Sequence, residues 1–528
     1  MKQRWKDGRV ERRTLVPARR WAAGVAVSLS VLPAFPPFAA AQCPDGAPPP
    51  CRAATRPVSV PAPNSVAVLY FDNLSRDSAD AYLADGLSED VITRLGQVER
   101  LVVKSRSAVQ RLRGAAAGDP GALGQALGVA HLVTGSVRRV GSGLRVTVEL
   151  VRATSGVHVW GDQYDRRDAD VLAIEDDIAR QVATAIAGRL APPERQALTR
   201  HPSGSAEAYD HFLRGNYYLA QRALTQAITQ YESAARLDPQ FADALARSAL
   251  GYALSLDWDL YPGVPPDSLL GRGEAAAARA LQLNPRSSDA WMTRGYLLTF
   301  HNPLTYDGVA EALRQAIAID PRNAEAYHFR GVIVAELGED SAAAEAAHQA
   351  LAIDPLRAIT LNALGRVEMI AHRYDAALRW LDSALAADPG FGLARAFRLR
   401  VRLLQGDTAQ ARRDAQGLAG MGVTDFGLTA SALALMEART GDTVAARARL
   451  NQELRATAAG AMGYRRASWL AIGLVAAGEA ERALDLLGGL RRSRRLWYAL
   501  RFPEFDAVRR NPRFQRLVEE SRPMGAPR

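Results

Sequence analysis

Few residues in this chain have types and spacings that could do chemistry. Glu175, Asp176 and Asp177 are adjacent acids, and paired carboxylates can act as acid and base or bind calcium. They lie in an amphipathic stretch, 169–190, where acidic side chains are usually solvated, so we expect no catalysis there. The stretch VGSGLR (140–145) is glycine-rich like a phosphate-binding loop. It joins two expected strands, however, so we interpret it as a hairpin turn.

Metal and cofactor sites are not predicted. The eight histidines are scattered and the two cysteines lie near the N-terminus, whereas a metal site needs its ligands clustered. The motifs GxxxxGK(S/T), HExxH and GxSxG do not occur. We therefore expect a protein without enzymatic activity, cofactor or metal.

The net charge of +10 is concentrated at the two ends of the chain. Residues 1–41 carry a net charge of +6 and residues 491–528 one of +7, which leaves −3 for residues 42–490. Nucleic-acid binding requires a basic face, so this slightly acidic body argues against DNA or RNA as a partner. We interpret residues 491–528 as a basic C-terminal cap whose arginines could contact a membrane surface or an acidic partner.

The first 41 residues have the features of a secretory signal peptide, in the usual order. A basic run ending at Arg20 precedes the apolar segment 21–32, and small residues at Ala39 and Ala41 follow. We expect cleavage after Ala41, secretion through the inner membrane and a periplasmic or cell-envelope location. The alternative is an uncleaved signal that anchors the protein in the inner membrane, although the apolar segment is shorter than the ~20 residues that span a bilayer.

Residues 42–64 are interpreted as a Pro-rich linker, because they contain too many prolines to pack against a core. Cys43 and Cys51 lie in this segment. In an oxidising compartment they could form a disulfide, and two unpaired thiols are the alternative.

A regular break interrupts the helix-forming second half of the chain. Five prolines, at 239, 285, 321, 355 and 389, each follow Asp or Asn and lie 46, 36, 34 and 34 residues apart. A proline inside a helix costs ~3 kcal/mol, and five such penalties would rival the ~5–15 kcal/mol that keeps a domain folded. The prolines must therefore mark helix boundaries. An alanine stands five positions before each one, and a glycine stands 24 positions before three of them, so paired helices could approach closely.

This pattern resembles the tetratricopeptide repeat in its period, its early Gly, its later Ala and its closing Pro. The resemblance implies tetratricopeptide repeats over residues 205–391, and periodicity alone predicts degenerate helical repeats over 392–490, about eight helical hairpins in all. We expect a loop at 257–270 and a capping helix at 502–520. Such hairpins would stack into an all-α superhelical solenoid with a concave groove. The residues assigned to repeat packing are Gly215, Ala234, Pro239, Gly331, Ala350, Pro355, Gly365, Ala384 and Pro389.

The resemblance also implies that the first helix of each repeat lines the groove and binds a protein or peptide partner. The partner-binding candidates on these helices are Asn216, Tyr252, Tyr296, Glu325, His328, Asn362 and Arg366. The alternatives are that the aromatic residues belong to the core between helices and that the polar ones are solvated.

Between residues 65 and 192 the apolar period changes from 3.6 to 2. Strands are expected at 65–71, 101–105 and 158–166, a hairpin at 131–156, and helices at 80–98, 121–128 and 169–190. This order, βαβαβββα, predicts an α/β sandwich. The stretches SVAVLYFDNLS, ADGLSEDVITRL, GVAHLVTGSVRR and GVHVWGDQYDR resemble the TolB amino-terminal-like domain, which commonly precedes tetratricopeptide repeats. The resemblance implies protein–protein contact in the cell envelope.

In many relatives this pair of domains lies outside the membrane, and a DNA-binding domain, nucleotide cyclase or kinase lies on the cytoplasmic side. Only 20 residues precede the apolar segment here, so we expect no such output module in this chain. The leading interpretation is an exported, non-enzymatic protein–protein interaction scaffold of the bacterial cell envelope. The alternative is an extracytoplasmic sensor or regulatory component of a signalling system whose output module is on another chain.

Overall fold

The computed structural model describes residues 61–528 except 78–79, 111, 113–117, 142, 168–170, 199–202, 259, 261–263, 302–307, 420, 422–426, 457–462, 491, 525 and 527–528. The predicted signal peptide, its cleavage point and the predicted disulfide between Cys43 and Cys51 lie outside the described residues. No described helix has both the length and the apolar character needed to cross a bilayer.

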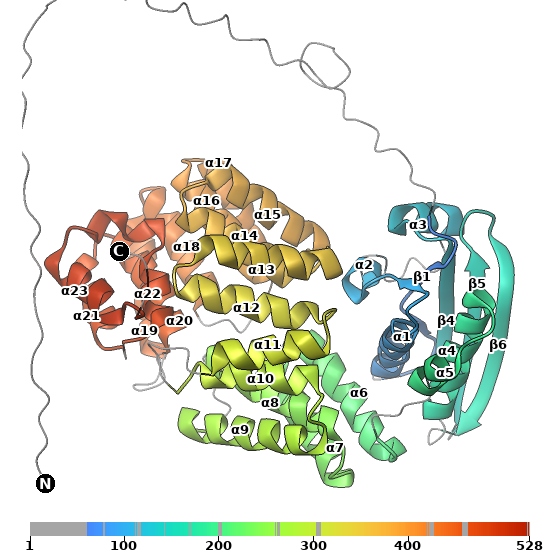
Figure 1. Ribbon diagram of the computed structural model, residues 1–528. Helices are drawn as coiled ribbons and strands as arrows, with labels where there is room; N and C mark the ends of the chain where they lie inside the picture. The colour runs from blue at the N-terminus through green and yellow to red at the C-terminus, as the bar shows by residue number, and fades with distance from the viewer. Residues whose placement is uncertain are drawn as a thin grey trace, which may run out of the picture. The chain divides into compact units, whose positions relative to one another are not determined.

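The N-terminal part of the described chain forms one sheet with helices against it (Figure 1). In the sheet β1 pairs in parallel with β3 and β4, β2 pairs with β4, and β4, β5 and β6 follow one another antiparallel. The elements are β1 Ser65–Val68, β2 Asp72–Asn73, α1 Ala81–Leu95, β3 Val102–Val103, α2 Arg106–Gln110, α3 Pro120–Leu127, β4 His131–Val140, β5 Gly143–Arg152, β6 Val157–Arg167, α4 Val171–Ala187 and α5 Pro192–Leu198.

The period-2 pattern of β5 explains how this sheet is covered. Leu144, Val146, Val148 and Leu150 alternate with more exposed residues and are buried, and α4 packs against β5 while α1 packs against β4. The hairpin between β4 and β5 turns at Gly141, whose φ of +62° suits glycine. The predicted order βαβαβββα is incomplete, because it omits β2, α2 and α5. These elements are two, five and seven residues long, too short to show a period.

The rest of the chain forms, within the described residues, eight helical hairpins, the number that the sequence predicts (Figure 1). They are α6 Ala206–Ala220 with α7 Leu224–Leu237, α8 Ala242–Asp257 with α9 Pro266–Leu283, α10 Ser288–Leu298 with α11 Val309–Ile319, α12 Ala324–Glu336 with α13 Asp340–Ile353, α14 Ala358–Ile370 with α15 Tyr374–Ala387, α16 Gly392–Leu404 with α17 Thr408–Ala419, α18 Leu428–Arg439 with α19 Thr443–Ala456, and α20 Tyr464–Ala476 with α21 Ala480–Gly488. These pairs make up a helical solenoid, as the sequence predicts.

The Asp-Pro breaks lie at helix ends for a local reason. Proline disfavours helical geometry in the residue before it, and Asp354, for example, has a φ of −128° and a ψ of 87°. The backbone N–H of Asp354 donates the last hydrogen bond of α13 to the carbonyl of Ala350, at 2.9 Å. The same bond recurs before the other four prolines, and all five of the acceptor alanines are fully buried.

The glycines of the repeat lie against close neighbours. A Cβ on Gly215 would lie 2.4 Å from the ring of Tyr231, and one on Gly365 would lie 2.7 Å from Leu381. Each of these contacts joins the two helices of one hairpin, so only glycine permits the observed approach.

Two boundaries differ from those predicted. The expected loop at 257–270 is shorter, because α9 begins at Pro266, and proline is well tolerated in the first turn of a helix. The expected capping helix at 502–520 is a 3₁₀ helix, η3 Pro503–Val508, followed by α23 Pro512–Ser521. A further helix that the sequence did not predict, α22 Arg494–Leu500, comes before them.

One apolar core continues from the sheet into the first hairpin. Tyr209, Phe212 and Leu213 of α6 belong to the same buried cluster as β1, α1 and α4. A Cβ on Gly86 of α1 would lie 2.9 Å from Leu213, so the two helices are closely packed. The core therefore crosses the boundary between the predicted segments 65–192 and 205–391.

Candidate functional site: the groove cavity

The first helices of successive hairpins line one cavity of about 730 Å³, which we call the groove cavity. Residues from α6, α8, α10, α12, α14, α16, α18 and α20 lie on its walls, and α22 contributes Arg495, Tyr498 and Ala499. Every second helix of the array thus presents side chains to the same space. This is the arrangement expected when hairpins stack and their first helices face inward.

The structure brings most of the predicted partner-binding residues together. Tyr296, Glu325, His328, Asn362 and Arg366 line the groove cavity. The two remaining candidates, Asn216 and Tyr252, lie elsewhere.

Asn216 lines a second cavity, to which Glu325 also contributes. The Asn216 amide oxygen accepts a hydrogen bond from the Tyr231 hydroxyl at 2.8 Å. Tyr252 lines neither cavity. Its hydroxyl donates to Glu232 and its Cβ packs against Gly273 of α9, so the side chain is directed between helices.

Asn362 is buried without partners in the wall of the groove cavity. Its side chain is 1% exposed, and neither its amide nitrogen nor its amide oxygen has a hydrogen-bond partner among the described residues. Beside it, the Thr360 hydroxyl lies 3.1 Å from Nδ1 of His328. Burial, Arg357 and Arg366 together lower the pKa of His328 well below its usual value, so its imidazole is neutral at physiological pH.

Two arginines lie against the same aromatic ring at one end of the cavity. The guanidinium carbon of Arg366 is 5.8 Å from the ring centre of Phe397, and that of Arg400 is 4.7 Å from it. Arg400 is 1% exposed, also lies over Trp469 and Phe502, and donates through Nε to Glu504. One donor of each arginine, Nε of Arg366 and Nη2 of Arg400, is buried and has no partner in the part of the chain that the structure describes.

Arg400 was missed in the sequence, although a signal was present. It follows Arg366 by 34 residues, which is the repeat period, so it occupies the same position one hairpin later. The last of the Asp-Pro helix boundaries is at Pro389. Beyond it only the helical periodicity remained, and no partner-binding residues were assigned there. Tyr498 was missed because α22 has no counterpart in the repeat.

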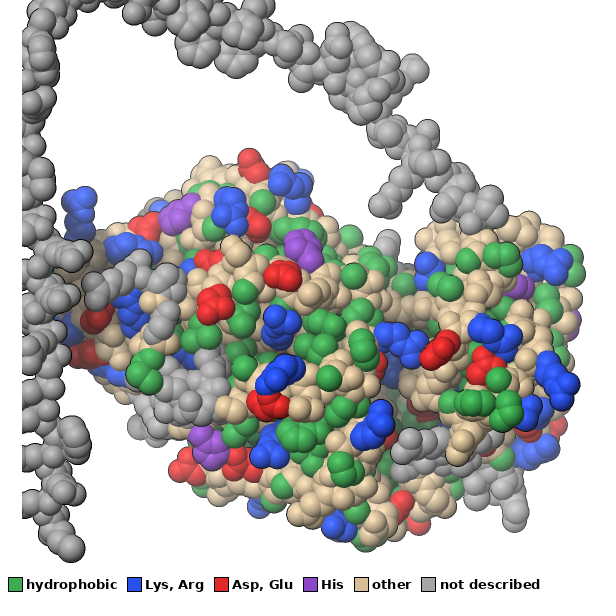
Figure 2. Space-filling view, viewed as in Figure 1, with side chains coloured by type: hydrophobic (Ala, Val, Ile, Leu, Met, Phe, Trp, Pro, Cys, Tyr) green, Lys and Arg blue, Asp and Glu red, His purple; other side chains and the backbone are tan. Residues whose placement is uncertain are grey.

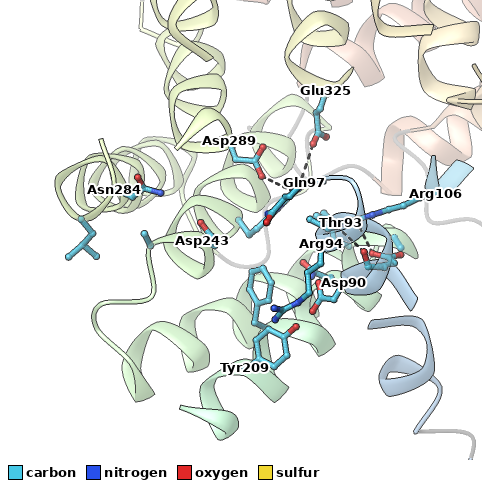
Figure 3. Close-up of a pocket in the computed structure, with 18 of the residues that line it drawn as sticks. Asp90, Thr93, Arg94, Gln97, Arg106, Tyr209, Asp243, Asn284, Asp289 and Glu325 are labelled. Carbon is cyan, nitrogen blue, oxygen red and sulfur yellow. Dashed lines mark hydrogen bonds and ion pairs between the residues drawn. The ribbon is translucent and has the colours of Figure 1, made fainter. Parts of the chain in front are cut away.

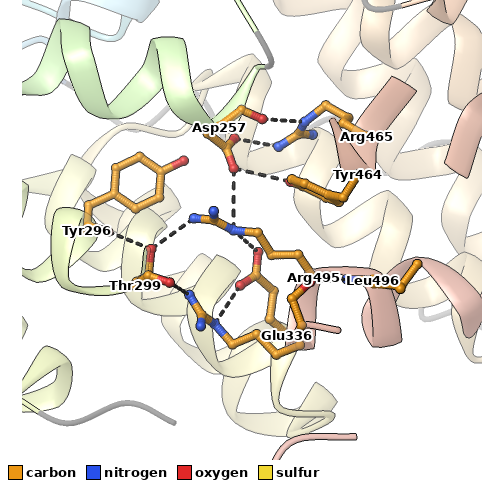
Figure 4. Close-up of polar contacts among 10 residues, drawn as sticks. Asp257, Tyr296, Thr299, Glu336, Tyr464, Arg465, Arg495 and Leu496 are labelled. Carbon is orange, nitrogen blue, oxygen red and sulfur yellow. Dashed lines mark hydrogen bonds and ion pairs between the residues drawn. The ribbon is translucent and has the colours of Figure 1, made fainter. Parts of the chain in front are cut away.

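A network of buried charges holds α22 against the repeats (Figure 4). The guanidinium of Arg495 lies between Asp257 of α8 and Glu336 of α12, at 3.7 and 3.6 Å, and donates to the Thr299 hydroxyl at 2.9 Å. Arg465 of α20 also contacts Asp257. Burial opposes ionisation of Asp257, but Arg465 and Arg495 outweigh it and lower its pKa.

Several arginines of the C-terminal segment are buried or paired within the fold, and contact of this segment with a membrane surface or an acidic partner stays a prediction. Arg494 and Arg495 are buried, Arg501 pairs with Asp340, and Arg513 pairs with Glu481 and Asp485. On the face in Figure 2, acidic and basic side chains are interspersed over the helices. The pairing of Arg501 with Asp340 could not be predicted from the sequence, because the two residues are 161 positions apart.

The second cavity, which we call the polar cavity, measures about 720 Å³ and lies between α1 and the starts of several repeat helices (Figure 3). Arg247 pairs there with Asp289 at 2.8 Å and with Glu325 at 3.5 Å. Arg94 of α1 lines the cavity and pairs with Glu175 of α4 at 3.2 Å. The hydroxyl of Tyr209 donates to the same carboxylate at 2.9 Å.

Glu175 was expected to be solvated, and this expectation is wrong. It is fully buried, because it lies on the apolar face of α4 with Ile174 and Ile178. Burial and the nearby Asp90 raise its pKa well above the usual value. Burial likewise raises the pKa of Asp90, to about 6, although Arg94 opposes the shift.

In the described part of the chain, no group of three or more His, Cys, Asp and Glu side chains is arranged to hold a metal ion. The groups that line the two cavities are carboxylate, guanidinium, amide, imidazole, hydroxyl and aromatic ones. Such groups recognise a ligand by hydrogen bonds, charge and stacking.

Comparison with known proteins gives one relative in sequence and several partial likenesses in structure. No family model matches the chain. Over 224 residues it is 33% identical to putative adenylate cyclase 3 of Rhizobium meliloti (strain 1021), which covers 42% of this chain. The chain spans only 38% of the length of that relative.

The solved structures match the chain only in part. They include PilF of Pseudomonas aeruginosa (18% identity, 41% of this chain and 91% of that one, TM-score 0.33) and a tetratricopeptide repeat protein of Parabacteroides merdae (12%, 51% and 99%, 0.35). The human IFIT1 dimer with m7Gppp-AAAA is a third (14%, 60% and 84%, 0.40). All three TM-scores are below 0.5, and no function of this chain follows from them.

Proposed function

We propose that this chain is an exported, non-enzymatic scaffold of the bacterial cell envelope that binds a protein or peptide partner in the groove cavity. The observation that supports this most directly is the convergence of eight inner helices on one cavity, whose wall contains buried polar groups that have no partner among the described residues. The residues proposed to contact the partner are Tyr296, Glu325, His328, Asn362 and Arg366, with Asn216 at the adjoining polar cavity.

The energetics of these groups favour a bound partner. A buried donor or acceptor without a hydrogen bond costs ~1–3 kcal/mol, and a partner that supplies the missing bond recovers this free energy. Phe329, Phe397 and Trp469 add apolar surface to the same walls. Aromatic anchors beside a few polar groups are typical of the centre of a protein interface.

Partner capture tests this function. The full chain would be used as bait in envelope extract, beside a variant that combines Asn362→Ala with Arg366→Ala. We expect the variant to lose a partner that the wild-type chain captures, with its unfolding midpoint unchanged. Arg379→Ala is the control, because Arg379 is exposed on the outer helix α15. Equal capture by wild type and the double variant would refute the groove as the binding site.

Export rests on the N-terminal sequence and has its own test. The basic run followed by the apolar segment 21–32 is typical of a secretory signal. We expect the protein in the periplasmic or envelope fraction, with Gln42 as its first residue if the signal is cleaved after Ala41. Recovery of the protein in the cytosolic fraction would contradict the proposal.

A second candidate is an extracytoplasmic sensor or regulatory component of a signalling system. The similarity to a putative adenylate cyclase favours it, because the chain matches only part of that relative and the remainder is absent from the match. In this case the captured partner would itself carry a cyclase, kinase or DNA-binding domain. Identification of the captured protein by mass spectrometry separates the two candidates.

A further inference from the structure

The polar groups in the walls of the groove cavity are not accessible from outside. The Asn362 side chain is 1% exposed and both of its amide atoms are buried, and Arg400 in the same walls is also 1% exposed. A partner that bonds to these groups, as the proposed function requires, can reach them only after part of the wall has moved. The contacts that hold the wall together therefore determine how the cavity opens.

One part of this wall joins hairpins that are far apart in the sequence. The turn between α6 and α7, in the first hairpin, contacts the link between α15 and α16, in the fifth and sixth. Nη2 of Arg222 lies 3.2 Å from Oδ2 of Asp388, and the guanidinium carbon of Arg222 lies 4.6 Å from the ring centre of Phe391. All three residues line the cavity. Stacked hairpins ordinarily contact only their neighbours, so this contact closes the array on itself.

The backbone of Arg222 is unusual for its residue type. Arg222 has a φ of +62°, and in the described part of the chain it and His372 are the two non-glycine residues with a positive φ. Both are the second residue after the first helix of a hairpin. At this position four other hairpins have glycine: Gly338, Gly406, Gly441 and Gly478. Glycine adopts this conformation without the steric cost of a Cβ, so the first hairpin bears that cost where its side chain reaches Asp388.

The Arg222 contact is also more exposed than the ion pairs that fix α22. The side chains of Arg222 and Asp388 are 45% and 39% exposed, whereas those of Arg494 and Glu336 are 1% and 9% exposed. Water and salt screen an exposed ion pair, so it breaks readily, and removing one partner of a buried pair is far more costly. The contact of Arg222 is therefore expected to release first.

We propose that Arg222 is a latch that keeps the groove cavity closed and admits a partner when its contacts with Asp388 and Phe391 break. The turn of the first hairpin then separates from the link between α15 and α16, and the inner walls become accessible. This inference rests on the proposed function, because it describes how a partner reaches the groove. It also makes opening sensitive to salt, since salt weakens the exposed ion pair.

The reaction of a thiol inside the cavity measures the opening. Ser468 of α20 lies in the cavity wall and is 5% exposed, so Ser468→Cys introduces a thiol there with little change in size. The full chain with this substitution is treated with N-ethylmaleimide, and mass spectrometry of the peptide that contains position 468 gives the labelling rate. Adding Arg222→Gly should raise this rate about fivefold, the factor that corresponds to the ~1 kcal/mol of an exposed ion pair and a cation–π contact.

His372→Gly is the matched control. It makes the same change at the same turn position of the fifth hairpin, where the His372 ring bonds to Tyr374, two residues away. We expect it to leave the labelling rate unchanged. Circular dichroism checks that each variant is folded.

Asp388→Asn is a second test, which removes the charge and should keep the turn. Asn284 precedes Pro285 at the equivalent break, and its side-chain oxygen accepts a backbone hydrogen bond from the second residue after it, as that of Asp388 does. The labelling rate should increase, but less than in Arg222→Gly, because the contact with the Phe391 ring stays.

Salt gives an independent measurement. Raising NaCl from ~0.01 to ~1 M shortens the screening length from ~30 to ~3 Å. Labelling should become faster in the chain that has Arg222 and should change less in Arg222→Gly.

Equal labelling rates with and without Arg222→Gly overturn the inference, and so does an equal increase in His372→Gly. If Arg222→Gly does not fold, Asp388→Asn decides, and an unchanged rate in that variant refutes the latch. The proposed function fails separately, when the Asn362→Ala/Arg366→Ala variant captures the envelope partner as well as the wild-type chain does, because thiol labelling requires no partner.

Discussion

The groove cavity and the polar cavity are almost equal in volume, about 730 and 720 Å³, but their charged groups are used differently. In the polar cavity Arg94 and Arg247 both pair with carboxylates of the same chain. In the groove cavity both amide atoms of Asn362 lack partners and Arg366 has no acid paired with it among the described residues, whereas in the polar cavity one oxygen of Asp90 lacks a partner there. Cavity size alone therefore does not identify a binding site, and unsatisfied polar groups are the more informative feature.

The largest loss of stability is expected from a substitution at the polar cavity. Arg94→Met removes the partner of the fully buried Glu175 and should lower the free energy of unfolding by about 3–5 kcal/mol. Urea unfolding followed by circular dichroism measures this change. Arg180→Met, which breaks an exposed pair with Asp177, should cost under about 1 kcal/mol. Similar losses in the two variants would mean that the Arg94 cluster does not stabilise the fold.

A smaller loss is expected where α22 meets the repeats. Arg495→Met leaves Asp257 with Arg465 and Glu336 with Arg494, so the loss should be about 1–3 kcal/mol, smaller than that of Arg94→Met. The same unfolding experiment gives the value. A loss larger than that of Arg94→Met would show that the groove depends on buried ion pairs as strongly as the polar cavity does.

The pH dependence of stability should also distinguish the polar cavity. Because burial raises the pKa of Asp90 from 3.8 to about 6, its contribution to stability is full below pH 3.8 and is lost as the pH rises toward 6. Asp90→Asn should therefore gain stability relative to the wild-type chain across this range and keep a constant difference above it. Unfolding at pH 4, 5, 6 and 7 measures the difference, and a constant value from pH 4 to 7 would contradict the assignment.

The smallest change in the free energy of unfolding is expected at the groove cavity, and it is a gain in stability, not a loss. Asn362→Leu replaces a buried amide without partners by an apolar side chain of similar size, so the unliganded protein should become more stable by up to about 1 kcal/mol. A loss of stability would indicate that the Asn362 amide is bonded within the fold.

The sequence predicted the helical array well because the signals that set it are local. Proline excludes helix in the residue before it, and a small residue such as Gly365 is required where two helices of one hairpin meet. Both features recur at the repeat period, so a single sequence is enough to detect them. Asn362 and Arg366 were assigned to the groove through the resemblance to the tetratricopeptide repeat, and they lie one helical turn apart on α14.

The charged partners could not be predicted in this way. Arg494 and Glu336 are 158 residues apart, and nothing in either segment indicates the other. Glu175 was assigned to solvent because acids on helices are usually exposed, and only the packing of α1 and α6 around it shows why it is buried. Long-range ion pairs depend on the completed fold, whereas helix boundaries depend on neighbours along the chain.

The bracing of α22 has a mechanical consequence. Stacked hairpins contact only their neighbours, so such arrays can extend elastically and lose their outer repeats one at a time. Here α22 bonds to α10 and α12 while Arg465 of α20 bonds to α8, and these contacts connect early and late hairpins directly. These bonds would have to break before the array could be stretched, so it should be stiffer than an array without them. They should also make its hairpins unfold together in one cooperative transition.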